Sequence, residues 1–177
     1  MASLINSAGA TGTGTMTLQG PNTNSNQVLT IPDTTGTMMV SGNMPAFSAY
    51  MGNNQSISNS TFTKVQFNTK TFDTNSNYDA TTNYRFTPTV AGYYQCNVTI
   101  NTQTSANTTL ISIYKNNSSY LSGLQLPSTV FQVGSMSALI YMNGTTDYLE
   151  VFFYGGATTL NAGSGATQFS AAMVRAA

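Results

Sequence analysis

The segment Tyr84–Ile100, YRFTPTVAGYYQCNVTI, alternates regularly between two kinds of residue. Its even-numbered positions are apolar or small: Tyr84, Phe86, Pro88, Val90, Gly92, Tyr94, Cys96, Val98 and Ile100. The odd-numbered positions between them are mostly polar. A period of two is typical of a β-strand with one buried face. Pro88 and Gly92 interrupt this pattern, because both residues weaken a central strand.

Similar alternation recurs along the chain after residue 45. One face is apolar in AFSAYM (Phe47, Ala49, Met51), FTKVQF (Val65, Phe67) and FSAAMV (Phe169, Ala171, Met173). The Asn-, Thr-, Ser- and Gly-rich stretches 68–83 and 155–168 predict loops. Nowhere does a long segment of helix-forming residues show a period of 3.6. The pattern predicts an all-β sandwich of many short strands, with Cys96 as a buried thiol.

Two segments, MSALIYM (136–142) and YLEVFFY (148–154), are apolar on both faces. Leu139, Tyr141, Phe152 and Tyr154 lie on the side opposite to the expected core. A monomer would expose these side chains as a large apolar patch, which usually marks a protein interface. We therefore expect a homo-oligomer, with these four residues and Tyr94 in the subunit interface or the core. Phe152→Asp is expected to break the assembly.

The composition is poor in charge. Only 6% of the 177 residues are charged, against roughly 25% in an ordinary soluble domain, and the formal net charge is zero. No run of basic residues is present to neutralise phosphates, so we expect no nucleic-acid partner. No stretch approaches the ~18 apolar residues of a membrane span, and the N-terminus lacks the pattern of a secretory signal, so we expect no membrane insertion.

Residues 1–44 differ from the rest of the chain. Their three short β-like runs, Met16–Gln19, Val28–Ile31 and Met38–Val40, are separated by turn-forming sequences. Each run offers too few apolar side chains to offset the entropy of ordering the chain. We expect this extended N-terminal segment (1–44) to order only against another surface or against copies of itself, and residues 45–177 to form the domain.

The order of the predicted strands resembles the C1q domain of the C1q/tumour-necrosis-factor jelly-roll superfamily, over about residues 46–176. The matching positions are Phe86, Pro88, Gly92 and Tyr94, the turn Lys115–Asn116–Asn117, and Phe169 with Ser170. The resemblance implies an antiparallel jelly roll that trimerises about a threefold axis lined by aromatic and aliphatic residues. It also explains the interruption, because Pro88 and Gly92 would form the corner at which the chain enters a new strand.

The segment TLQGPNTNSNQVLTIPDTTGTMMV is similar to short segments of bacteriophage tail-fibre and other virion proteins. Together the two resemblances imply a homotrimeric structural protein of a phage virion, as a tail fibre or capsid decoration. The sequence departs from the secreted animal members of the C1q family, because it contains no collagen-like Gly-x-y repeat. Residues 1–44 would bind other virion proteins, and the domain would bind a host-surface glycan. A freestanding bacterial C1q-like lectin or adhesin is the alternative.

Composition limits the chemistry. The chain has no histidine, which excludes Ser-His-Asp triads, Cys-His dyads and ordinary zinc sites. Asp147 and Glu150 are close in sequence but would point to opposite sides of a strand, so we expect no enzyme, no catalytic residue and no cofactor. Asp73 and Asp79 bracket a loop that would either bind calcium or hold two solvated acids. Tyr78 and Tyr120 are the loop aromatics that would contact a glycan.

Overall fold

The computed structural model describes residues 24–25, 42, 44–103, 109–123 and 132–177. These ranges contain thirteen strands: β1 (Ala46–Tyr50), β2 (Gln55–Ile57), β3 (Thr63–Lys64), β4 (Thr69–Asp73), β5 (Tyr78–Asp79), β6 (Arg85–Phe86), β7 (Gly92–Thr102), β8 (Leu110–Lys115), β9 (Ser118–Gly123), β10 (Gln132–Met142), β11 (Leu149–Tyr154), β12 (Thr158–Leu160) and β13 (Gln168–Ala176). Within the same ranges, no helix is long and apolar enough to span a membrane. The predicted all-β class is confirmed.

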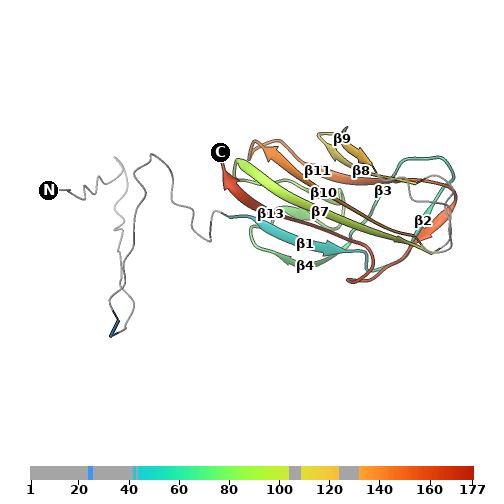
Figure 1. Ribbon diagram of the computed structural model, residues 1–177, viewed down its shortest axis with the longest axis horizontal. Coiled ribbons are helices and arrows are strands. Elements are labelled where there is room, and N and C mark those ends of the chain that lie inside the picture. Colours follow the sequence, from blue (N-terminus) through green and yellow to red (C-terminus); the bar gives the residue numbers. More distant parts are fainter. Residues whose placement is uncertain (1–23, 26–41, 43, 104–108, 124–131) are drawn as a thin grey trace. The chain divides into compact units, whose positions relative to one another are not determined.

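The strands form two antiparallel sheets that pack as the layers of a sandwich (Figure 1). Sheet A has the order β2-β12-β7-β13-β1-β4, with β10 also paired to β7. Sheet B has the order β5-β6-β11-β8-β9, with β3 also paired to β11. This arrangement confirms the expected jelly-roll sandwich. Sheet membership matters for function, because β10 and β11 follow one another in sequence but lie in different sheets.

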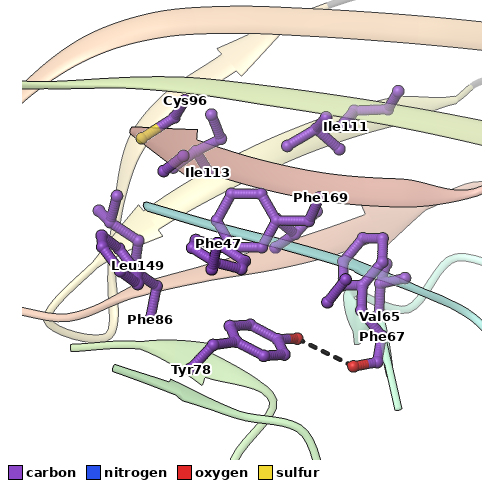
Figure 2. Close-up of a cluster of buried hydrophobic side chains, with 14 of the residues drawn as sticks. Phe47, Val65, Phe67, Tyr78, Phe86, Cys96, Ile111, Ile113, Leu149 and Phe169 are labelled. Carbon is purple, nitrogen blue, oxygen red and sulfur yellow. Dashed lines mark hydrogen bonds between the residues drawn. The ribbon is translucent and has the colours of Figure 1, made fainter. Parts of the chain in front are cut away.

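The hydrophobic core fills the space between the sheets (Figure 2). Phe47 of β1 lies at its centre, with ring centroids 4.6 Å from both Tyr78 and Phe86 and 5.0 Å from Phe169. The residues predicted to face inward in β1 and β13 are buried. Period-two alternation therefore identified the core face correctly.

The segment Tyr84–Ile100 is divided between the two sheets. β6 ends at Phe86 in sheet B, and β7 begins at Gly92 in sheet A, so the chain crosses from one layer to the other between them. Phe86 and Tyr94 nevertheless both point into the core, with ring centroids 5.4 Å apart. The predicted corner is confirmed. The hydroxyl of Tyr94 donates a 2.7 Å hydrogen bond to the carbonyl of Val90 and so fixes the corner from within.

Replacing Tyr94 by Phe tests this contribution. The change keeps the buried ring but removes the donor to the Val90 carbonyl, so we expect the free energy of unfolding to fall by about 1 kcal/mol. Denaturant titration at a fixed protein concentration measures the loss. A variant as stable as the parent would show that the corner is held by packing alone.

Two predicted loops contain strands. The stretch 68–83 includes β4 and β5, and 155–168 includes β12. Polar residues are tolerated in β4 because it is an edge strand of sheet A, paired only to β1 and largely exposed. The predicted β-like runs of segment 1–44 lie outside the described residues.

Candidate interaction surface

The outer face of sheet A carries an exposed apolar cluster made of Tyr93, Leu139 and Tyr141, here called the sheet A patch. Their side chains are 40%, 54% and 43% exposed. Tyr93 of β7 and Tyr141 of β10 are directly opposite in the antiparallel ladder, and their ring centroids are 5.5 Å apart. Leu139 precedes Tyr141 by two positions on the same face of β10. Three large apolar side chains are thus placed together in solvent.

A ladder of polar side chains continues from this patch along β7 and β10. Gln95 donates to the hydroxyl of Ser137 (2.6 Å), and Ser137 donates to the amide oxygen of Asn97 (2.9 Å). Thr99 and Ser135 share a 3.3 Å hydrogen bond one step further along the ladder. These side chains bind one another, so they offer small polar contacts rather than an activated nucleophile. The face is chemically suited to another protein surface.

Sheet B is different, because the outward-facing aromatic side chains of β11 are partly covered by other residues of the chain. Phe152 packs against Tyr114 with ring centroids 4.3 Å apart, and Phe62 lies over Tyr154 at 4.8 Å. The ammonium of Lys64 is 5.8 Å from the centroid of the Phe152 ring. Both Phe152 and Tyr154 are consequently only partly exposed, whereas Phe62 itself is 44% exposed.

The five residues predicted for the interface or core therefore divide into three groups. Tyr94 is fully buried in the core. Leu139 and Tyr141 are exposed on sheet A, whereas Phe152 and Tyr154 lie on sheet B. The expectation that the last four share one apolar face is wrong, because the turn after β10 takes the chain into the other sheet. Tyr93 was missed, although its place among the odd-numbered, mostly polar positions marked it as an outward-facing aromatic residue.

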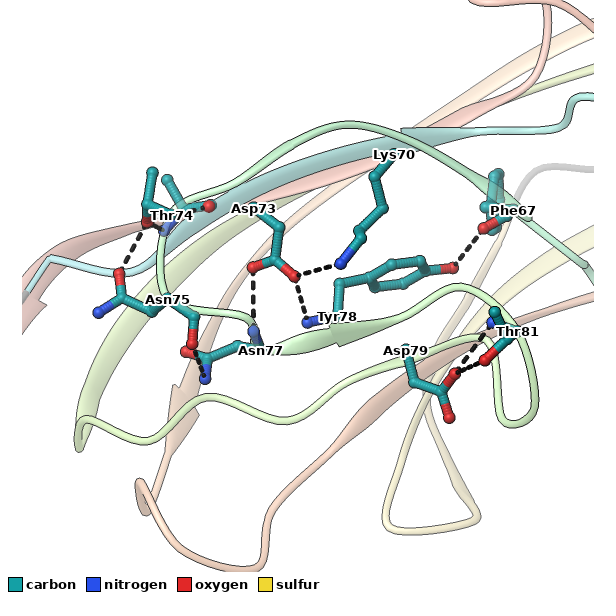
Figure 3. A network of polar contacts seen from close by, with 10 residues as sticks. Phe67, Lys70, Asp73, Thr74, Asn75, Asn77, Tyr78, Asp79 and Thr81 are labelled. Atoms are coloured by element: carbon teal, nitrogen blue, oxygen red, sulfur yellow. Dashed lines mark hydrogen bonds and ion pairs between the residues drawn. The ribbon is translucent and has the colours of Figure 1, made fainter.

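The acids Asp73 and Asp79 hold turns. Asp73 accepts hydrogen bonds from the backbone N–H groups of Asn77 (2.9 Å) and Tyr78 (3.0 Å) and from Lys70 (3.3 Å) (Figure 3). Asp79 accepts from the N–H groups of Thr81, Thr82 and Asn83. The oxygens of Asp73 are thus occupied by donors of the chain, and its side chain is only 4% exposed, which contradicts the solvated loop acid expected there.

The candidate loop aromatics also differ in placement. Tyr78 lies in β5 and is buried, and its hydroxyl donates to the Phe67 carbonyl (3.2 Å). Tyr120 lies in β9 and is 51% exposed. Of the two, Tyr120 alone remains accessible to a partner.

The acids Asp147 and Glu150 bind two different lysines. Glu150 of β11 is buried and forms an ion pair with Lys64. Asp147, in the turn before β11, is also buried and binds Lys115 at 2.8 Å. Neither carboxylate is presented to a substrate. Among the described residues, no group of three or more acids or cysteines is arranged to hold a metal ion.

The carboxylates of Asp79 and Asp147 make the stability of the fold depend on pH. The N–H groups of Thr82 and Thr81 hold the pKa of Asp79 well below its ordinary value near 4. Burial raises the pKa of Asp147, but hydrogen bonds from Lys115 and Asn116 outweigh it and lower that pKa. Since both folded-state values lie below the unfolded ones, the stabilisation is complete above about pH 4 and is lost as the pH falls further.

We therefore expect a lower melting temperature at pH 3 than at pH 7. Asp79→Asn should reduce the difference between the melting temperatures at pH 3 and pH 7, because it removes one of the groups that titrate. An unchanged difference would exclude Asp79 as a source of the acid sensitivity. Thermal melts followed by circular dichroism, on the parent and on Asp79→Asn at pH 3 and pH 7, measure this difference.

Comparison with known proteins identifies the architecture. The profile of the C1q domain family matches residues 46–172. The fold is similar to the globular domain of zebrafish complement 1qA, at 18% identity and a TM-score of 0.57, covering 75% of this chain and 99% of that one. Murine APRIL at pH 8.0 is 10% identical with a TM-score of 0.61, covering 74% and 99% of the two chains. The PRD1 vertex protein P5 is 16% identical with a TM-score of 0.56, covering 74% and 97%. No curated protein sequence matches this one.

Proposed function

This chain belongs to the C1q domain family, and we propose that it is a homotrimeric structural protein of a bacteriophage virion, with the sheet A patch in the contact between subunits. The observation that carries the trimer is the exposure of Tyr93, Leu139 and Tyr141 together on one sheet. A monomer would leave this cluster in water, whereas a neighbouring copy removes it from solvent.

A closed threefold ring needs two different surfaces on each subunit, because its contacts are heterologous. The second surface is proposed to be the edge strand β9, which carries exposed Tyr120 and Leu121 and no charged residue. Among the described residues β9 is an edge strand of sheet B, and an uncharged edge with apolar side chains is a site prone to association. In a trimer, the sheet A patch of one copy covers the β9 edge of the next.

The virion assignment rests on three supports. The sequence of segment 1–44 resembles segments of phage tail-fibre and virion proteins. The solved structures with a similar fold include a vertex protein, P5 of PRD1. The surface has little charge to keep free molecules apart, which is easier to tolerate in a fixed assembly. Tail fibre and capsid decoration are the two places within the virion that fit.

The proposed role is structural and not enzymatic. All four acids within the described ranges, Asp73, Asp79, Asp147 and Glu150, bind lysines or hold turns, and the chain has no histidine. Adhesion to a host glycan would use exposed surface away from the subunit contact. A freestanding adhesin is the competing function, and it needs no particle-binding segment.

Deleting residues 1–44 distinguishes these functions. The truncated protein should remain a folded trimer, because the sheet A patch and β9 are retained, but it should no longer bind virions that lack the protein. Sedimentation with such virions, compared between full-length and truncated trimers, measures the loss. Equal binding by the truncated trimer would show that the C1q-like domain is the anchor, and failure of the full-length trimer to bind would favour the adhesin.

A further inference from the structure

Two turns at one end of the sandwich meet on the carboxylate of Asp147. One oxygen accepts from the side-chain amide of Asn116 (2.7 Å), in the turn between β8 and β9. The other accepts from the backbone N–H of Asn143 (3.0 Å), in the turn between β10 and β11. Asn116 also exchanges backbone and side-chain hydrogen bonds with Tyr148. The turns 116–117 and 143–148 therefore form one hydrogen-bonded unit.

Lys115 connects this unit to the sheet A patch. Its ammonium lies 2.8 Å from the second oxygen of Asp147 and donates to the backbone carbonyl of Tyr141 at 2.7 Å. The same ammonium is 5.7 Å from the centroid of the Tyr141 ring. Lys115 ends β8 in sheet B, whereas Tyr141 lies in β10 of sheet A. One side chain thus reaches from one layer to the exposed ring on the other.

We propose that Asp147 and Lys115 are positioning residues for the subunit contact, which set the backbone and ring of Tyr141 in the orientation that the neighbouring copy binds. This inference rests on the proposed trimer, and it adds a role for two residues outside the sheet A patch. Asp147 fixes the lysine through a charge-assisted contact of 2.8 Å between the carboxylate and the ammonium. The lysine fixes the tyrosine through its carbonyl and through a cation–π contact.

A second lysine–aspartate pair in the same chain serves as the control. Lys70 binds Asp73, which also accepts two N–H groups from a turn, so the local chemistry matches that of Lys115 and Asp147. No aromatic ring contact is found for Lys70 within the described ranges. Lys70→Met therefore removes a similar ion pair without touching the proposed contact.

The test compares the monomer–trimer equilibrium of the parent, Lys115→Met, Asp147→Asn and Lys70→Met by sedimentation equilibrium. We expect Lys115→Met and Asp147→Asn to weaken association about tenfold or more at each contact, with far-UV circular dichroism unchanged, and Lys70→Met to have no effect. In a Tyr141→Ala background, Lys115→Met should weaken association little further, because the ring that the lysine orients is gone although the backbone carbonyl at position 141 remains. If Asp147→Asn does not fold, the lysine variants alone decide the result.

Each contrary outcome has a separate meaning. A Lys115→Met trimer as tight as the parent overturns the positioning role while the proposed trimer stands. Equal losses from Lys115→Met with and without Tyr141 also overturn it, since they show a general effect on the fold. A parent protein that is monomeric at micromolar concentration overturns the proposed trimer itself, and the positioning role with it.

Discussion

Leu139→Asp is expected to produce folded monomers, whereas Phe152→Asp is expected to unfold the domain. Both changes place a carboxylate on an outward-facing strand position, so they introduce the same charge into the two sheets. Leu139 is 54% exposed in the isolated chain, and an aspartate there remains hydrated until a neighbouring copy covers it. Burying that unpaired charge in the contact would cost several kcal/mol, which is enough to weaken association by a hundredfold or more.

An aspartate at position 152 would not be hydrated in the same way, because neighbouring side chains surround this position. The Phe152 ring packs on Tyr114 and lies beside Lys64, whose ammonium already binds Glu150 and the carbonyl of Asn83. Replacing it removes aromatic packing and places a carboxylate close to Glu150. Truncating a fully buried phenylalanine costs about 3–5 kcal/mol. For the partly exposed Phe152 the packing loss is smaller, but the like charge beside Glu150 adds to it, and the total is expected to be a large part of the domain's stability.

Sedimentation velocity and circular dichroism on both variants separate the two effects. The expected result is a small, β-rich species for Leu139→Asp and lost β signal for Phe152→Asp. A trimeric Leu139→Asp variant would mean that the contact lies elsewhere on the molecule. Folded monomers from Phe152→Asp would restore the sequence-based assignment of that ring to the interface.

The separation of Phe152 from Leu139 into different sheets shows which structural information the sequence holds. Alternation along a strand is local, so it correctly separated Ile140 from Leu139 and Phe153 from Phe152. Which sheet a strand joins depends on partners distant in sequence, such as Thr102 to Gly92 for β10 and Leu110 to Lys115 for β11. The cover that Phe62 gives to Tyr154 is equally non-local. A sequence pattern with apolar residues on both faces of a strand therefore predicts that the outer face is covered, but it does not distinguish a loop of the same chain from another subunit.

Turn chemistry was only partly predictable. The Pro88–Gly92 corner was expected because the resemblance to the C1q domain places a proline and a glycine where the chain enters a new strand, and both residues weaken a continuous central strand. The role of Asp147 could not be identified, because its three donors come from residues 115, 116 and 143. An acid in a Gly-Thr-rich turn suggests only that the turn is stabilised. The link from Asp147 to Tyr141 depends on the ends of both sheets lying together.

Two glycines make the corner possible, and replacing either one should be strongly destabilising. A Cβ atom on Gly92 would lie 2.4 Å from the carbonyl oxygen of Arg175 in β13. One on Gly144, in the turn between β10 and β11, would lie 2.3 Å from the nitrogen of Ala91. Both neighbours are backbone atoms, which cannot rotate away as a flexible side chain can. The corner residues are therefore packed against β13 and against this turn at backbone contact distance.

Gly144→Ala should be the worse of the two substitutions. Overpacking costs roughly 1–3 kcal/mol at either site. Gly144 also has φ of 72°, where an L-residue costs about 1–2 kcal/mol more than glycine. The control is Gly165→Ala, because a Cβ atom there meets nothing within 4 Å and its cost should stay within about 0.5 kcal/mol. We expect the melting temperature to fall by roughly 10 °C for Gly144→Ala, measured at one protein concentration because subunit association contributes to stability. Equal melting temperatures for Gly144→Ala and Gly165→Ala would show that the turn moves away from Ala91 at little cost. In that case the close approach of this turn to Ala91 would not be needed to hold the corner, which would depend on Pro88, the Tyr94 hydroxyl and the packing of Gly92 against β13.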